Sequence, residues 1–283
     1  MRALPLLIGL LLPSSALATW PDDVSLSSMT HHNGLPVTDQ AALLESYERL
    51  VQELGAAIAN KPYAPAATLG ANGFGFSVGS TGMYTNPPSR EGPTPWERAH
   101  ADETPEAFLF VPTISARKGL PYSVEVGATL GWLGLTHQGV FSGFARVALL
   151  EGYKPLPDLT VQVGYAGYVG NPELEMGVVD LSVSLGSTFP FGTYKGIHHG
   201  QLSPYVNVGF LQVGAAPVVD AQTGEAIFGA DAEATIGRRS GYGLRPQIAG
   251  GFNMSNSTVL FRAVATYAVG LPPTLHAGIG FTY

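Results

Sequence analysis

The sequence predicts an all-β protein: a transmembrane antiparallel up-and-down β-barrel of about 10 strands, with 8 or 12 as alternatives, and one N-terminal amphipathic α-helix. Three observations predict this class. Apolar residues alternate with small or polar residues along most of the chain after residue 66. Charged residues make up only 12% of the chain, about half the share of a typical soluble domain. No later window holds the roughly 18 to 20 uninterrupted apolar residues of a spanning helix, so only a closed barrel could cross a membrane.

Residues 1–18 have the features of a cleaved signal peptide. One positive charge at Arg2 precedes the apolar run Ala3–Leu12, and small residues before Ala18 suit cleavage after that residue. The apolar run is too short for a membrane anchor. We therefore expect an exported protein.

Composition excludes several other classes. The chain has no Cys, which rules out a lipid-attached cysteine and any disulfide framework. A net charge of −7 offers no basic surface for nucleic acid.

Residues 19–37 are polar and rich in turn-forming residues, and we expect a disordered lead-in. The pairs His31-His32 and His198-His199 could each contribute to a metal site, but neither has a suitably spaced third ligand. We therefore interpret both pairs as loop residues and expect no metal and no cofactor.

Residues 38–60 are predicted to form the amphipathic helix, with Thr38 as its N-cap. Its apolar stripe comprises Leu43, Tyr47, Leu50, Val51, Leu54 and Ile58. Such a stripe could pack on the barrel mouth, fill the lumen as a plug, or lie in the membrane interface. Because the polar face is acidic, anionic lipid is a poor partner. We expect the helix to pack on the periplasmic end of the barrel.

Residues 66–283 are predicted to form the barrel. The clearest strand is Tyr122–Trp132, whose apolar face has an aromatic residue at each end, as expected for a membrane band with two aromatic girdles. The other expected strands lie near Phe74–Val78, Phe108–Ile114, Val140–Leu150, Leu159–Tyr165, Val179–Leu185, Leu202–Phe210, Tyr242–Phe252, Val259–Tyr267 and Pro273–Tyr283.

Three irregular segments interrupt these strands. Thr81–Thr104 and Ala215–Ser240 are expected to be long outer loops, the second with a possible small hairpin, because such barrels keep long loops outside the cell. Phe189–Gln201 is interpreted as a further loop. Keeping Ala215–Ser240 out of the barrel gives the even strand number typical of bacterial single-chain barrels.

If the apolar faces meet lipid, the polar faces line a lumen. The lumen-lining residues are then Glu125, Arg146, Gln162, Asp180, Asn207, Arg245, Gln247, Arg262 and His276. A charge facing hydrocarbon would cost about 2–4 kcal/mol for a midplane Arg, whereas inside the barrel opposite charges can pair. These residues could form a salt-bridged polar core or line a narrow polar passage.

An enzyme is the third possibility. His276, Asp180 and either Ser182 or Ser184 could be drawn as a hydrolytic set. No local motif marks either serine, so we expect no catalytic residues and no enzyme.

The signal peptide, the absence of Cys, the alternating strands with aromatic ends and the final Phe-Thr-Tyr resemble the small bacterial outer-membrane β-barrel proteins of the OmpW-type and porin-like groups. The resemblance implies the bacterial outer membrane as location, its lipid as surroundings, and the barrel assembly machinery as a partner that reads the final strand ending in Tyr283. The helix at residues 38–60 departs from the family pattern and puts a simple open pore in doubt. The resemblance implies no solute and no oligomeric state.

We therefore expect a narrow porin-like channel for small solutes. A closed structural or binding barrel acting through its outer loops is the alternative, and an outer-membrane lipid hydrolase is less favoured.

Overall fold

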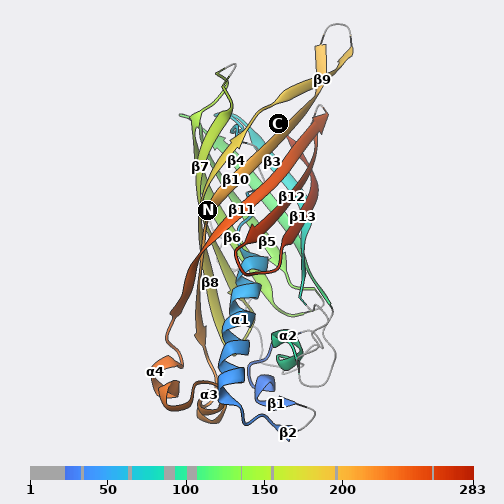
Figure 1. Cartoon of the computed structure of the whole chain (residues 1–283). Coiled ribbons are helices and arrows are strands. Elements are labelled where there is room, and N and C mark those ends of the chain that lie inside the picture. The colour runs from blue at the N-terminus through green and yellow to red at the C-terminus, as the bar shows by residue number, and fades with distance from the viewer. Residues whose placement is uncertain are drawn as a thin grey trace, which may run out of the picture.

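A computed structural model describes residues 23–32, 35–62, 66–85, 93–100, 107–134, 136–153, 156–194, 197–256 and 258–283. Eleven strands form one antiparallel sheet, and all except β9 close into a ring, which leaves ten strands in the barrel (Figure 1). The ring closes where β13 pairs with β3, and it is continuous across β10 and β11. The predicted closed barrel of ten strands is confirmed.

The bounds of the strands are β3 (Phe74–Tyr84), β4 (Phe108–Leu120), β5 (Val124–Trp132), β6 (Gly139–Leu150), β7 (Asp158–Val169), β8 (Leu174–Gly186), β9 (Phe189–Tyr194), β10 (Ile197–Pro217), β11 (Ser240–Asn256), β12 (Val259–Ala268) and β13 (Thr274–Thr282). The helices are η1 (Ser28–Thr30), α1 (Gln40–Ile58), α2 (Pro95–Arg98), α3 (Ala221–Phe228), η2 (Gly229–Asp231) and α4 (Ala232–Thr235), and β1 (His31–His32) pairs with β2 (Leu35–Pro36).

Successive residues of each strand face opposite sides of the barrel wall, because side chains alternate along a strand. On β5, Leu130 is 64% exposed on the outer face, whereas its neighbour Thr129 is 6% exposed on the inner face. Register places Glu125 of β5 directly opposite Arg146 of β6, both facing inward. Apolar side chains therefore cover the outside, and charges of opposite sign meet inside.

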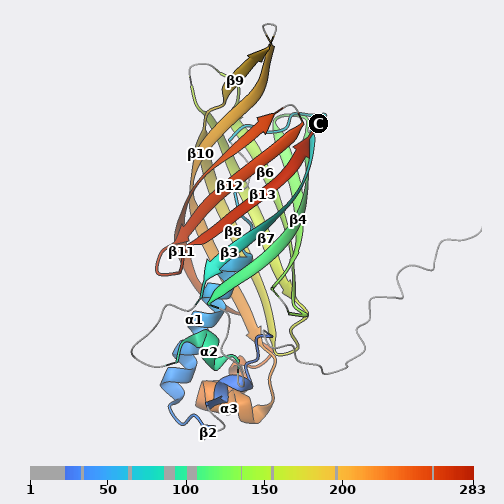
Figure 2. The ribbon, with the colours of Figure 1, turned by 90° about the vertical axis from the view of Figure 1, so that its right-hand side faces the viewer.

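Several predicted boundaries were wrong. Thr81–Tyr84 belongs to β3 and Ala215–Pro217 to β10, and the connection between β10 and β11 contains the helices α3 and α4 instead of a hairpin. Phe189–Gln201 is not a loop, because β9 and the start of β10 pair there beyond the barrel rim (Figure 2). Tyr122 starts a turn and not a strand, since its φ of 64° lies in the left-handed region.

The barrel has two different ends. At one end, here called the long-loop end, β3 is joined to β4, β5 to β6, β7 to β8, β10 to β11 and β12 to β13. At the other, the short-turn end, β4 is joined to β5, β6 to β7 and β11 to β12, and the paired strands β9 and β10 project there (Figures 1 and 2). The last strand, β13, ends at the short-turn end.

Helix α1 lies at the long-loop end. It packs against α2 and α3, and the ring of Tyr47 meets that of Phe228 edge-on at a centroid distance of 5.1 Å. The sequence analysis placed the helix and the long loops at opposite ends of the barrel, whereas the structure places them at the same end. The N-cap is Asp39 and not Thr38, because Asp39 accepts a hydrogen bond from the Ala42 N–H at 3.1 Å.

The two halves of α1 have different surroundings. The first half is amphipathic, but every residue from Glu53 to Ile58 is buried, and the helix also packs against β3, β4, β7, β8, β10 and β11. Its second half therefore enters the mouth of the barrel, as Figure 1 shows. None of the helices in the described ranges is long and apolar enough to cross a membrane.

Residues 23–32 are packed, in contrast to the disordered lead-in expected for 19–37. Leu26 and Met29 are completely buried. The carboxylate of Glu173, in the turn between β7 and β8, accepts hydrogen bonds from the backbone N–H groups of Leu26 (2.5 Å) and Ser27 (3.0 Å). The predicted signal peptide, residues 1–18, lies outside the described residues.

Candidate functional site: an occupied lumen

The chain from residue 59 to residue 73 is here called the luminal segment, and its described parts, 59–62 and 66–73, lie between the end of α1 and the short-turn end of the barrel. The segment starts where α1 ends, with Gly55 against Val213 on the inner face of β10. It finishes at Phe74, whose backbone N–H and C=O bond to Tyr283 beside the short-turn end. Residues 63–65 of the segment lie outside the described residues.

At mid-height the segment places Asn60 and Lys61 against the wall. The Asn60 side-chain nitrogen and the Asp180 Oδ2 atom both lie within 2.6 Å of the point that a Cβ at Gly164 would occupy. Lys61 is 2% exposed, donates to the Ala56 carbonyl at 2.5 Å, and interacts electrostatically with Asp180. Residue 164 must therefore be small, because the segment and the wall meet where its side chain would be.

This mid-height contact leaves hydrogen-bonding capacity unused. Within the described part of the chain, both amide atoms of Asn60 have no hydrogen-bond partner, whereas Asp180 interacts with Gln162 and Lys61. A buried polar atom without a partner costs about 1–3 kcal/mol. At mid-height Asn60 therefore contributes little to holding the segment, and the interaction of Lys61 with Asp180 holds it.

At the short-turn end the segment is held by a buried ionic cluster. Glu125 is completely buried and accepts hydrogen bonds from Arg146 at 2.8 Å and Arg117 at 3.3 Å. The same carboxylate accepts the backbone N–H of Leu69 at 3.0 Å, and Arg146 donates to the Ala67 carbonyl at 2.9 Å. The three charged side chains thus bind each other and the backbone of the segment, and we call them the anchor cluster.

Glu151 extends this attachment at the rim. Its carboxylate accepts the backbone N–H of Thr68 at 2.7 Å and the Thr68 hydroxyl at 2.9 Å. A Cβ at residue 119 would lie 1.8 Å from the Gly70 carbonyl oxygen, so Gly119 lets the segment approach the wall closely.

A second polar group of residues lies on the adjoining strands β12, β13, β3 and β4. Arg262 donates to the Ser115 hydroxyl at 3.3 Å, and Ser115 is 2.6 Å from the hydroxyl of Ser77. The Nδ1 atom of His276 lies 3.1 Å from the hydroxyl of Thr81.

The structure places all the residues predicted to line the lumen on the inner wall. Glu125, Arg146, Gln162, Asp180, Asn207, Gln247, Arg262 and His276 are buried. Arg245 is half-buried at the long-loop end, where it donates to the Val269 carbonyl at 2.8 Å and to Gln52 of α1. Sequence reasoning missed Arg117, because the expected strand near Phe108–Ile114 stopped short of it whereas β4 continues to Leu120.

The hydrolytic set considered from the sequence is not assembled. On the ring, β8 and β13 are separated by β10, β11 and β12, so Asp180 and His276 lie on distant strands. Ser184 bonds to Asn207 at 2.8 Å instead. No group of three or more His, Asp or Glu side chains in the described ranges could hold a metal ion.

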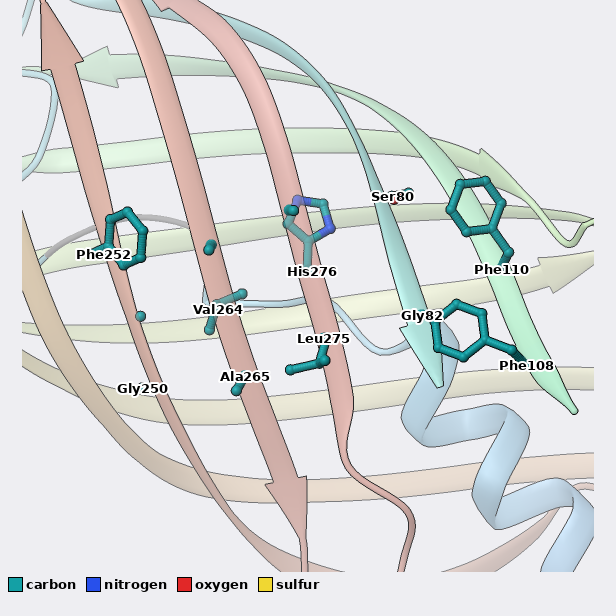
Figure 3. Close-up of a pocket in the computed structure, with 13 residues that line it drawn as sticks. Ser80, Gly82, Phe108, Phe110, Gly250, Phe252, Val264, Ala265, Leu275 and His276 are labelled. Carbon is teal, nitrogen blue, oxygen red and sulfur yellow. The ribbon is translucent and has the colours of Figure 1, made fainter. Parts of the chain in front are cut away.

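A hollow of about 500 Å³ lies on the outer surface (Figure 3). It crosses the ring closure from β11 to β4. Small outward residues such as Gly250, Ala265 and Gly82 form its floor, and Phe108, Phe110 and Phe252 stand at its sides. The lining is mostly apolar, with Ser80 and His276 as its polar members.

These features define the class of protein. A closed, even-stranded antiparallel barrel with an apolar exterior and a charged interior is the architecture of the transmembrane β-barrels of bacterial outer membranes.

The chain is similar to several solved structures, each at a low sequence identity and a low TM-score. The N-terminal β-barrel domain of Pseudomonas aeruginosa OprF is 11% identical with a TM-score of 0.30, over 76% of this chain and 99% of that one. The translocator domain of the autotransporter NalP from Neisseria meningitidis is 11% identical with a TM-score of 0.28, over 87% and 98%. Acinetobacter baumannii Omp33 is 9% identical with a TM-score of 0.27, over 75% and 99%. No protein-family model and no curated protein matches the chain.

Proposed function

We propose that this protein is a bacterial outer-membrane barrel that forms a narrow passage for small polar solutes and is closed at rest by its own luminal segment. The observation that carries the proposal is the charged inner wall with residues 59–73 threaded through it. A barrel needed only as a structural element could fill its interior with apolar side chains, which require no partners. The charged wall therefore favours passage.

The contacts of the segment support release. At mid-height both amide atoms of the buried Asn60 lack a hydrogen-bond partner among the described residues, and water could satisfy them once the segment moved. The attachment is concentrated at the anchor cluster and Glu151. Opening thus requires a few specific bonds to break and not the whole barrel to unfold.

The test is conductance in planar bilayers of the exported chain and of a variant lacking residues 38–59. We expect the full chain to be closed most of the time and the deletion variant to conduct steadily, because α1 no longer holds the segment in the mouth. Heat-modifiable migration on gels shows whether the variant still forms a closed barrel. Silence from a correctly closed variant would overturn the passage and favour a binding barrel acting through the long-loop end.

We further propose that the long-loop end faces the outside of the cell, since outer-membrane barrels have short periplasmic turns and long outer loops. Helix α1 would then be displayed at the cell surface. The test uses single cysteines at Leu35, 69% exposed beside α1, and at Tyr122, 94% exposed in a short turn. We expect a membrane-impermeant maleimide to label L35C on intact cells and Y122C only after lysis. The reverse pattern would contradict this orientation.

A further inference from the structure

We propose that the short-turn half of the lumen is an anion-selective constriction, so that the passage favours small carboxylates and phosphates over cations of similar size. The inference rests on the proposed passage and names its class of solute. It follows from the placement of the buried charges on the inner wall.

Among the described inward-facing residues of the barrel strands, the fully buried charges are three arginines and two acids. They are Arg117, Arg146 and Arg262 against Glu125 and Asp180, which gives a net charge of three minus two, or +1. Asp180 lies at the middle of β8, whereas Glu125 and the three arginines lie in the short-turn half. The buried charges of that half therefore sum to three minus one, or +2, while the half-buried carboxylates Glu151 and Asp158 lie at its rim.

The arginines are arranged around the passage. Arg117 and Arg146 lie on β4 and β6, on either side of Glu125, and Arg262 projects from β12 towards Ser115 of β4. A guanidinium group binds carboxylate and phosphate through directed N–H groups. In a narrow lumen with a low-dielectric wall, a small excess of fixed charge acts strongly on an ion passing through.

In the structure, the luminal segment already occupies part of this site. Arg146 donates to the Ala67 carbonyl oxygen, an acceptor with partial negative charge, at 2.9 Å. When the segment leaves, that N–H group loses its acceptor and faces the passage, where an anion is the best replacement. Lys61 leaves with the segment, so Asp180 becomes the opposing charge at mid-height.

The experiment measures the reversal potential of the openings of the full chain under a potassium chloride gradient. We expect the sign that corresponds to chloride passing more readily than potassium. Arg262→Gln should shift the reversal potential towards zero, Arg262→Lys should restore it, and Asp180→Asn should increase the chloride preference. Arg239→Gln is the control, because Arg239 is an exposed arginine in the connection between β10 and β11 at the long-loop end, away from the short-turn half of the lumen.

Openings without ion preference, or openings that favour potassium, would overturn this inference and leave the proposed passage intact. An unchanged reversal potential in both Arg262→Gln and Asp180→Asn would also overturn it. A complete absence of openings would instead overturn the passage itself, and the inference with it.

Discussion

Replacing Glu125 with alanine is expected to destabilise the barrel by about 3–5 kcal/mol, because it leaves two buried arginines without their shared carboxylate. Arg117 and Arg146 are each 4% exposed, so water cannot replace the lost partner without a rearrangement. The substitution also removes the acceptor of the Leu69 N–H. We therefore expect the luminal segment to leave the wall at the short-turn end, and the openings in planar bilayers to become longer and more frequent.

Two quantities are measured: the denaturant concentration at which half of the protein loses its heat-modifiable migration, and the fraction of time for which the channel is open in planar bilayers. Glu125→Gln keeps the shape and can still accept the Leu69 N–H, so its openings should increase less than those of Glu125→Ala. Glu175→Ala, an exposed carboxylate on the outer face of β8, should change neither quantity. Equal midpoints for Glu125→Ala and Glu175→Ala would show that the anchor cluster does not hold the segment.

A disulfide between residues 55 and 213 is expected to abolish the openings. A Cβ at Gly55 would lie 3.3 Å from the Cβ of Val213, close to the roughly 3.5–4.5 Å that disulfides bridge. The γ-carbons of Val213, which would lie 2.4 and 2.9 Å from that Cβ, are absent when residue 213 is cysteine. Because the chain has no other Cys, the pair cannot form a wrong disulfide within one molecule.

The oxidised G55C/V213C protein should remain closed because the last turn of α1 is fixed to β10. Reduction should return the openings to the level of the full chain. Val213→Cys alone is the control for the substitution and should respond to neither oxidant nor reductant. Openings that persist in the fully oxidised pair would mean that ions pass without movement of the helix.

The barrel could be predicted from the sequence because its two faces meet different surroundings. Leu130 faces outward and its neighbour Thr129 faces the lumen. Apolar and polar residues alternate regularly wherever the two faces differ in this way. The alternation is weaker at the ends of the barrel. Arg117 was missed because it is followed by Lys118 and Gly119, which look like a turn although the strand continues.

The occupied lumen could not be predicted because the segment is held largely through its backbone. Hydrogen bonds made by the Ala67 carbonyl and the Leu69 N–H do not depend on the side chains of these residues, so the sequence does not indicate them. The need for glycine at positions 119 and 164 becomes apparent only from the atoms that face them. That α1 and the long connections share one end of the barrel could not be predicted for a related reason. Its partners α2 and α3 are short helices inside segments that had been interpreted as loops.

The central claim is that the chain threads its own barrel, and cross-linking in the cell tests it most directly. The G55C/V213C protein, extracted from membranes without reductant and digested, should yield one peptide pair joined through residues 55 and 213. Recovery of both cysteines as free thiols after mild oxidation, from a barrel shown to be closed by heat-modifiable migration, would place α1 outside the lumen and contradict the account.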